Sequence, residues 1–240
     1  MRGMIDVHCH IVPAVDDGAA SKKEVRNLLL QEYKSGVREL ILTPHYRKGM
    51  FETPRDIVER RAEYVAREVD RIRLDMQVYL GCEYHANADM LMELCKEERF
   101  RMNGGRYVLV EFSGRHDYQR VRNYIYQLQQ EGYCPVVAHV ERYPQVIKQL
   151  EQVEELIELG AMIQVNAGSL LGENGFRMKN VSRSLLKKRW IHFIASDAHD
   201  SKTRYPNLGE CAKYVLKKMG KEYAETVFVK NPKKMLDGRR

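Results

Sequence analysis

The segment Asp6-Val7-His8-Cys9-His10 (residues 6–10) follows an apolar start and is closed by Asp16-Asp17-Gly18. Residues two apart on an extended strand point to the same face, so Asp6, His8 and His10 are expected to share one side. Imidazole is a common metal ligand, and two imidazoles on one strand face can clamp a metal ion. Two satisfied histidines near a strand end are the alternative for this segment taken alone.

The composition is typical of a globular chain with a large core: 240 residues, 44% hydrophobic and 30% charged. We expect one domain spanning residues 1–240, because chains of this length still form single α/β barrels. The formal net charge of +7 suits an acidic or phosphorylated partner, and equally nucleic acid or an anionic membrane surface. Charge alone does not choose among these partners.

The five cysteines are widely spaced and form no C-x-x-C pair, which argues against a disulfide framework and against a zinc knuckle. The N-terminus has no apolar signal-peptide core, and no apolar run approaches the roughly 18 residues that a membrane span needs. We therefore expect a soluble, cytoplasmic protein without membrane insertion.

One alternation recurs along the chain: short apolar runs rich in β-branched residues are followed by charged stretches with helical spacing. The expected strands are 7–12, 40–42, 76–80, 107–110, 134–138, 162–165 and 191–195. The expected helices are 22–34, 54–71, 88–96, 145–159, 182–188, 208–219 and 222–227. Nearly all-apolar strands that alternate with helices indicate a parallel sheet covered on both faces. Seven successive units without a phosphate-loop glycine pattern favour a closed barrel over an open sheet.

Potential metal ligands stand at the end of almost every expected strand. The active site of a parallel α/β barrel lies at the carboxyl ends of its strands, so these side chains are expected to meet there. They are His8, His10, His45, Glu83, Glu111, His139, Asp197 and His199. The remaining histidines are expected to be surface or packing residues: His85, His116 and His192.

This ligand set indicates a catalytic metal centre. Imidazole and carboxylate together suit zinc, manganese and iron, and their number exceeds the demand of one ion, so two or three divalent metals are expected. Clustered divalent ions lower the pKa of a bridging water and stabilise charge on attacking and leaving oxygens, which favours phosphoester hydrolysis. Metal-assisted hydrolysis of an amide or lactone is the nearest alternative.

The ordered motifs D-x-H-x-H, D-D-G, T-P-H, G-x-E, E-F, A-H-x-E-R and S-D-A-H resemble the polymerase and histidinol phosphatase (PHP) superfamily. VDDG (15–18), TPHYRKGMFETP (43–54), AHVERY (138–143) and IASDAHD (194–200) resemble its bacterial protein-tyrosine phosphatases, which are encoded with capsule or exopolysaccharide genes. The resemblance covers residues 4–232. It implies a distorted (β/α)7 TIM-like barrel, a manganese-favouring trinuclear centre, and a phosphorylated bacterial tyrosine kinase as substrate.

The resemblance also implies roles for individual residues. It places a first metal on His8, His10, Glu83 and Asp197, a second on Glu111 and His139 with Glu83 bridging, and a third on Asp17, His45 and His199. A hydroxide bridging two metals would attack phosphorus without a phosphoenzyme. Arg142 and Arg204 are expected to grip the phosphate oxygens, because guanidinium forks match phosphate geometry. A surface ion pair with Glu141 is the alternative for Arg142, and a free loop position is the alternative for Arg204.

Residues around these ligands carry weaker signals. Asp6 and Asp16 are expected to orient ligand imidazoles or to cap turns. The loop 46–51 carries Arg47 and Lys48 beside aromatic residues, which suits a phosphotyrosine ring, with a solvated basic loop as the alternative. Asn166 ends a strand without a charged ligand, so it either hydrogen-bonds to the site or merely finishes the strand.

Other functions are compatible with parts of the chain. Cys95 and Arg101 have the C-x5-R spacing of cysteine-dependent tyrosine phosphatases, but the residues between them include Glu97 and Glu98 and no glycine, which does not suit a phosphate loop. A histidinol-phosphate-type phosphatase or a nuclease is the enzymatic alternative. The non-enzymatic alternative is a nucleic-acid or membrane-surface module, but the basic residues form no recognisable motif, so we expect no stable nucleic-acid complex.

Overall fold

The computed structural model describes residues 1–96 and 100–238. Nine strands occur in these residues: β1 (Met4–Cys9), β2 (Val37–Leu42), β3 (His45–Tyr46), β4 (Gln77–Leu80), β5 (Glu83–His85), β6 (Tyr107–Glu111), β7 (Cys134–Val137), β8 (Met162–Asn166) and β9 (Phe193–Ala195). All seven expected strands are present. The two additional strands, β3 and β5, resume β2 and β4 after interruptions of two residues, one of which contains Pro44. Proline lacks the N–H that a strand ladder needs, which explains that break.

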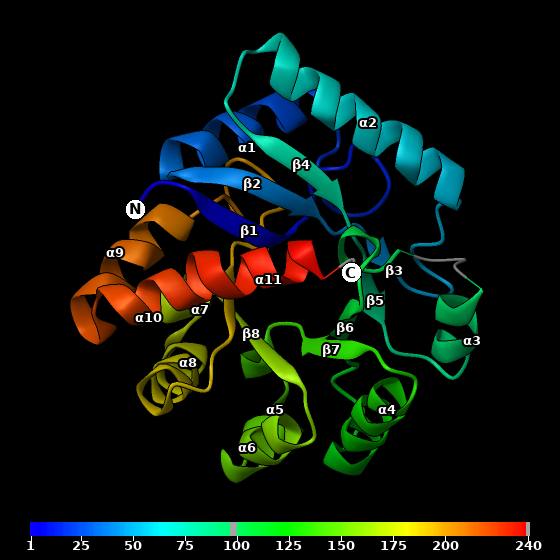
Figure 1. Ribbon diagram of the computed structural model, residues 1–240, viewed down its shortest axis with the longest axis vertical. Helices are drawn as coiled ribbons and strands as arrows, with labels where there is room; N and C mark the ends of the chain where they lie inside the picture. Colours follow the sequence, from blue (N-terminus) through cyan, green and yellow to red (C-terminus); the bar gives the residue numbers. More distant parts are fainter. Residues whose placement is uncertain (97–99, 239–240) are drawn as a thin grey trace.

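The strands form a closed ring. Their orders are β1-β2-β4 and β3-β5-β6-β7-β8-β9, with parallel pairing throughout. The Asp197 N–H donates to the His8 carbonyl at 2.9 Å and the His10 N–H donates to the Ala198 carbonyl at 2.8 Å, which joins the last strand to the first. Figure 1 shows the ring with helices around it. This architecture is the expected distorted (β/α)7 barrel.

The helices are α1 (Lys22–Ser35), α2 (Arg55–Arg71), α3 (Met90–Cys95), α4 (Tyr118–Gln130), α5 (Pro144–Ile147), α6 (Glu151–Glu158), α7 (Ala167–Leu171), α8 (Phe176–Lys188), α9 (Leu208–Met219), α10 (Lys221–Glu225) and α11 (Asn231–Asp237). Short 3-10 turns are η1 (Met102–Gly104) and η2 (Val140–Arg142), and η3 (Thr226–Lys230) is a π-helix. Among the described residues, no helix combines the length and apolar character that crossing a membrane requires.

The expected helices differ from the observed ones in several places. The helix expected over 182–188 begins earlier, at Phe176 of α8. The single helix expected over 145–159 is wrong, because α5 ends at Ile147 and α6 begins at Glu151. The expected helix 222–227 is divided between α10 and the π-helix η3. The helices α4, α7 and α11 were not expected, although Asp117 caps α4 by accepting a hydrogen bond from the Arg120 N–H at 2.8 Å.

Two apolar layers hold the barrel together. The larger layer lies between the strands and the surrounding helices. The smaller one fills the ring with one or two side chains from most strands, including Val7, Ile41 and Phe193, together with Met235 and Leu236 of α11. The α11 side chain of Asn231 donates to the His192 carbonyl at the start of β9, so α11 closes the end where the strands begin (Figure 1). The opposite end, where the strands finish, remains for the functional residues.

The expectation that Asp6 shares a face with His8 and His10 is wrong. The pairing of β1 with β2 shifts register between Asp6 and Cys9, and this irregularity reverses the alternation of side chains. Asp6 therefore faces outward, where it contacts Glu32 of α1 and accepts hydrogen bonds from the Ser196 hydroxyl (2.5 Å) and N–H (3.1 Å). Both imidazoles face the mouth of the barrel. Burial raises the pKa of Asp6, whereas burial and the neighbouring Asp6 carboxyl together raise the pKa of Glu32.

Candidate metal centre

The structure brings all nine predicted ligands together at the carboxyl ends of the strands. Their donor atoms form four overlapping groups, each with atoms within 4.8 Å of one another. The groups are His8, His10 and Asp197; His8, Glu83 and His139; His45, Glu83 and Glu111; and His10, Asp17, His45 and His199. Residues that are up to 191 positions apart in the sequence thus share one mouth because the ring closes between β1 and β9.

The innermost four side chains surround one point. The Nε2 atoms of His8 and His10 are 3.1 Å apart, and Glu83 Oε2 lies 3.2 and 3.3 Å from them. Asp197 Oδ1 lies 3.4 and 3.5 Å from the same two nitrogens. Ligand atoms about 2.0–2.2 Å from one ion stand about 3.0–3.6 Å from each other, so this spacing fits a single transition-metal ion.

Fixed acceptors orient three of the imidazoles. The His10 Nδ1–H donates to Asp16 Oδ2 at 2.8 Å, and the His199 Nδ1–H donates to the Asp197 carbonyl at 2.9 Å. The His8 Nδ1–H donates to Gln164 Oε1 at 3.2 Å. In each ring the proton is held on Nδ1, so Nε2 keeps its lone pair toward the centre, as a metal ligand requires.

A second group forms around the other oxygen of Glu83. His139 Nε2 lies 2.7 Å from Glu83 Oε1 and 3.9 Å from Glu111 Oε1. The Glu83 carboxylate therefore faces both the innermost group and His139, which is the bridging position that the resemblance implied. Burial and the nearby Glu83 charge raise the pKa of Glu111 to about 7, a cost that a cation between the two carboxylates would remove.

The third group is more open. Asp17 Oδ1 lies 3.5 Å from His45 Nε2 and 3.5 Å from His199 Nε2. The other nitrogen of His45 lies 2.9 Å from Glu83 Oε2, so this ring stands between the outer group and the inner one. The Phe51 ring stacks on His45, with 5.3 Å between centroids.

Several buried polar atoms at this mouth lack a well-oriented hydrogen bond to any described residue. They include His45 Nδ1, Glu83 Oε2 and His199 Nε2. Burial alone would raise the pKa of Glu83 and of Asp197, but the surrounding positive groups, His8 first, hold both pKa values well below the ordinary range. Buried polar atoms that lack a well-oriented hydrogen bond are costly, and cations bound in the separate ligand groups would reduce that cost.

Both predicted arginines contact this mouth. Arg142 Nη2 lies 2.8 Å from Asp197 Oδ2, so the alternative of a surface pair with Glu141 is not observed. Arg204 Nη2 lies 3.3 Å from Asp197 Oδ2, and Arg204 Nη1 lies 3.4 Å from Asp17 Oδ2. The two guanidinium groups also line a small cavity of about 80 Å³ beside Asp197.

Two residues that hold the site were missed by sequence reasoning. Gln164 Oε1 accepts from the His139 N–H at 2.7 Å and from His8, while its Nε2 donates to Asn166 Oδ1 at 2.8 Å. Asn166 Nδ2 donates in turn to Asp197 Oδ2 at 2.7 Å, so Asn166 does bond to the site. The Tyr143 hydroxyl lies 3.2 Å from His139 Nδ1. The sequence offered one indication of this role: Gln164 is a polar residue, two positions before Asn166, in an otherwise apolar strand.

A strained backbone conformation turns the side chains of two predicted ligands, His139 and Asp197, into the mouth of the barrel. His139 and Asp197 have φ values of 31° and 53°, in the left-handed region that residues other than glycine rarely adopt. Each is the second residue after a strand, β7 or β9, and the left-handed conformation ends the alternation of that strand so that the side chain enters the mouth. Such strain is typical of functional sites that the surrounding fold holds in place.

The structure also places the residues for which the sequence predictions were weaker. Lys48 pairs with Asp89 and Glu93 at 2.5 and 2.8 Å, so its ammonium is engaged away from the mouth. His85 lies beside Glu111 on the neighbouring strand, and burial lowers its pKa to about 4. His192 is a packing residue that accepts from the Ile163 N–H.

The cysteine alternative gains no support. Cys95 is the last residue of α3, Glu97 and Glu98 lie outside the described residues, and the Cys95 thiol contacts the Tyr133 hydroxyl.

Comparison with known sequences identifies relatives along nearly the whole chain. The model of the CpsB/CapC family, described as capsular polysaccharide synthesis, matches residues 4–237. Tyrosine-protein phosphatase CpsB of Streptococcus agalactiae is 35% identical over 238 residues, which cover 97% of this chain and 98% of the relative. Tyrosine-protein phosphatase YwqE of Bacillus subtilis is 34% identical over 215 residues, covering 90% and 84%.

Solved structures agree with this assignment. A crystal structure described as YwqE from Bacillus subtilis and CpsB from Streptococcus pneumoniae, unique metal-dependent tyrosine phosphatases, matches with a TM-score of 0.92 and 31% identity over 99% of this chain and 96% of the other. Histidinol phosphate phosphatase from Lactococcus lactis shares the fold, with a TM-score of 0.58 and 13% identity over 92% and 95%. The expected PHP-type barrel is confirmed, and the chain belongs to the CpsB/CapC family of capsular polysaccharide synthesis proteins.

Proposed function

We propose that this chain is a metal-dependent protein-tyrosine phosphatase that acts on a phosphorylated bacterial tyrosine kinase and thereby controls capsule or exopolysaccharide synthesis. Its relatives are named tyrosine-protein phosphatases. The observation that carries the proposal is the convergence of nine imidazole and carboxylate side chains, with two arginines, at one end of the barrel. A net charge of +7 suits a phosphorylated protein partner.

The donor set fits two to three divalent ions. One would be held by His8, His10, Glu83 and Asp197, one by Glu111, His139 and Glu83, and one by Asp17, His45 and His199. Imidazole with carboxylate suits manganese, iron or zinc, and we propose manganese on the family resemblance. When bound, such ions activate water and stabilise the charge of the phosphoryl group.

The chain's own residues would supply orientation and charge. Arg142 and Arg204 would bind the non-bridging phosphate oxygens, because their guanidinium groups already reach the edge of Asp197 and present planar donors. Asp16, Gln164 and the Asp197 carbonyl would keep the protons of His10, His8 and His199 on Nδ1. No cysteine nucleophile is required in this scheme.

Hydrolysis of a phosphotyrosine peptide tests the proposal. We expect turnover with Mn²⁺, loss of turnover with a chelator, and recovery when Mn²⁺ is returned. Histidinol phosphate and single-stranded DNA serve as comparison substrates, because they represent the small-molecule phosphatase and nuclease alternatives. Turnover that survives complete metal removal, or a preference for either comparison substrate, contradicts the proposal.

A further inference from the structure

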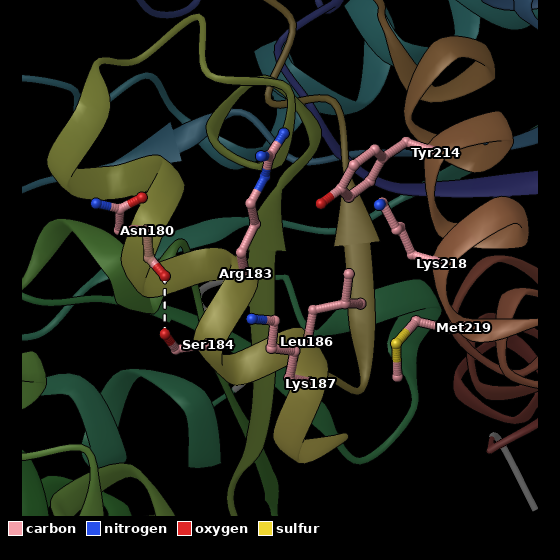
Figure 2. Close-up of a pocket in the computed structure, with 8 residues that line it drawn as sticks. All are labelled: Asn180, Arg183, Ser184, Leu186, Lys187, Tyr214, Lys218 and Met219. Atoms are coloured by element: carbon pink, nitrogen blue, oxygen red, sulfur yellow. Dashed lines mark hydrogen bonds between the residues drawn. The ribbon is translucent and has the colours of Figure 1, made fainter.

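A second hollow lies on the outer wall of the barrel, between α8 and α9. Its volume is about 470 Å³, which falls within the range of about 300–1,000 Å³ typical of small-ligand sites. Figure 2 shows Arg183 and Lys187 of α8 on one side and Tyr214 and Lys218 of α9 on the other. The proposed mechanism uses none of these residues.

The charge of this hollow is uniformly positive. Arg183 and Lys187 are one turn apart on the same face of α8, and Lys218 faces them from α9. Within residues 1–96 and 100–238, no carboxylate oxygen lies within 4.0 Å of these three cations, whereas many other cations of the chain are paired. Like charges at this spacing repel each other, so the arrangement favours an anionic ligand.

The walls of the hollow suit an aromatic group. The Arg183 guanidinium lies 4.7 Å from the centroid of the Tyr214 ring, and Arg183 Nε donates to the Leu170 carbonyl at 3.1 Å, which holds the side chain in place. Figure 2 shows the Tyr214 hydroxyl and the Lys218 ammonium directed toward the same gap. Leu186 is 2% exposed and Met219 is half-buried, and both supply apolar lining.

The hollow is distinct from the metal centre. In a βα barrel each helix runs back toward the start of the next strand, and α8 leads to β9. Lys187 is near the carboxyl end of α8, and Lys218 and Met219 are near the carboxyl end of α9. These positions lie toward the end of the barrel opposite the metal ligands, so a group bound here is not the one hydrolysed.

We propose that this hollow binds an aryl phosphate, as the side chain of a second phosphotyrosine on the substrate protein. The guanidinium fork of Arg183 and the ammonium of Lys218 would bind the phosphate, Lys187 adds positive charge at the rim, and Tyr214, Leu186 and Met219 would contact the ring. Anchoring one phosphotyrosine would raise the local concentration of others at the metal centre. That the aryl phosphate belongs to a substrate protein rests on the proposed function, whereas the match between the hollow and an aryl phosphate does not.

Direct binding is the first test. Phenylphosphonate, an aryl phosphate mimic that cannot be hydrolysed, is titrated into the full chain with a chelator present, and backbone amide shifts are followed by NMR. We expect saturable shifts in α8 and α9, beside any shifts at the mouth near Arg142 and Arg204. The double variant Lys187→Glu, Lys218→Glu should bind at least about tenfold more weakly, as loss of charge-assisted hydrogen bonds predicts. Lys217→Glu carries the same type of charge reversal on α9, outside the hollow, and should leave binding unchanged.

Defined results overturn the inference. The inference is wrong if α8 and α9 show no saturable shifts. It is also wrong if inorganic phosphate binds as tightly as phenylphosphonate, because the ring would then contribute nothing to binding. Binding of phosphatidylserine vesicles without any phenylphosphonate binding indicates a membrane contact instead. Lys218→Gln, which removes charge without reversing it, serves as the second variant if thermal unfolding shows that the double variant is unstable.

Kinetics separate this site from the proposed function. With a doubly phosphorylated tyrosine peptide, the double variant should raise KM about tenfold, whereas turnover of p-nitrophenyl phosphate should stay within about twofold of the unmodified chain. Equal KM values for the peptide contradict the docking role. If the chain has no phosphatase activity at all, the proposed function fails while the phenylphosphonate titration still decides whether the hollow binds aryl phosphate.

Discussion

The inner and outer ligand groups at the barrel mouth differ in how the fold holds them. The side chains of His8, His10 and Glu83 are completely buried, and their donor atoms come from strands or strand ends. Asp17, in contrast, lies in the loop after β1 with 48% of its side chain exposed. A buried, strand-held set is preorganised for an ion, whereas a loop-held set remains open to solvent and substrate. The inner group is therefore expected to bind metal more tightly.

Breaking the inner group should have the largest effect. Asp197→Ala removes a proposed ligand and also deprives Arg142 of its 2.8 Å partner. We expect loss of bound metal and a fall in phosphatase activity of at least about a thousandfold, because the charge that stabilises the phosphoryl group is lost with the metal. Elemental analysis and a phosphotyrosine assay measure both. His139→Ala, which removes a proposed ligand of the second group, should have the same effect. Full metal content with full activity in either variant would contradict the ligand assignment.

The variant Arg142→Ala distinguishes the binding of phosphate by the guanidinium group from the binding of metal by the inner group. Arg142 touches Asp197 but is not a proposed ligand, so we expect the metal content to be retained. Turnover should fall about 10²–10³-fold, since one preorganised donor to the phosphoryl oxygens is removed. Metal analysis beside kcat measurements tests this. A parallel loss of metal would show that Arg142 acts only by supporting Asp197.

Weakening the outer group should have a milder, recoverable effect. Asp17→Asn keeps the size of the side chain but removes the charge that faces His45 and His199. We expect activity to fall about 10–100-fold at low Mn²⁺ and to recover in part at high Mn²⁺. A Mn²⁺ titration of activity measures this. Loss that no Mn²⁺ concentration repairs would remove the distinction between the two groups.

The pH dependence of metal binding should also follow the inner group. Burial alone would lower the pKa of His8 and of His10, but the carboxylates around them outweigh burial and raise both values. Burial lowers the pKa of His199 in the outer group to about 4. Metal must displace protons from the inner imidazoles, so affinity should fall as pH falls, about tenfold per pH unit for each proton displaced. Mn²⁺ titrations between pH 6 and 8 test the sign, and affinity that rises toward pH 6 contradicts it.

Cys95→Ser should have the smallest effect of all. Cys95 lies on α3, outside both ligand groups, so activity should stay within about twofold of the unmodified chain. A phosphotyrosine assay on the variant measures this. Abolished turnover would overturn the metal mechanism in favour of a cysteine nucleophile.

Much of the architecture was predictable because the strands of a parallel barrel are buried on both faces and read as apolar runs. Each of the seven runs became a strand, and the predicted ligands that follow six of them reached the mouth. The break between α5 and α6 was not predictable, since helical spacing continues through it. The roles of the nine residues as ligands, and the reading of residues 1–240 as one domain, stay predictions.

The sequence by itself determined the family, the order of the strands and of most helices, and which side chains stand at strand ends, because these follow from local apolar patterns and from motifs. Only the tertiary structure decided which of those side chains meet. The register shift in β1 turns Asp6 away from His8, and the left-handed backbone at His139 and Asp197 turns their side chains inward. The bonds from Gln164 to His8 and from Asn166 to Asp197 likewise exist only because β8 lies between its neighbours in a closed ring. Such contacts depend on packing between distant segments, which no local pattern encodes.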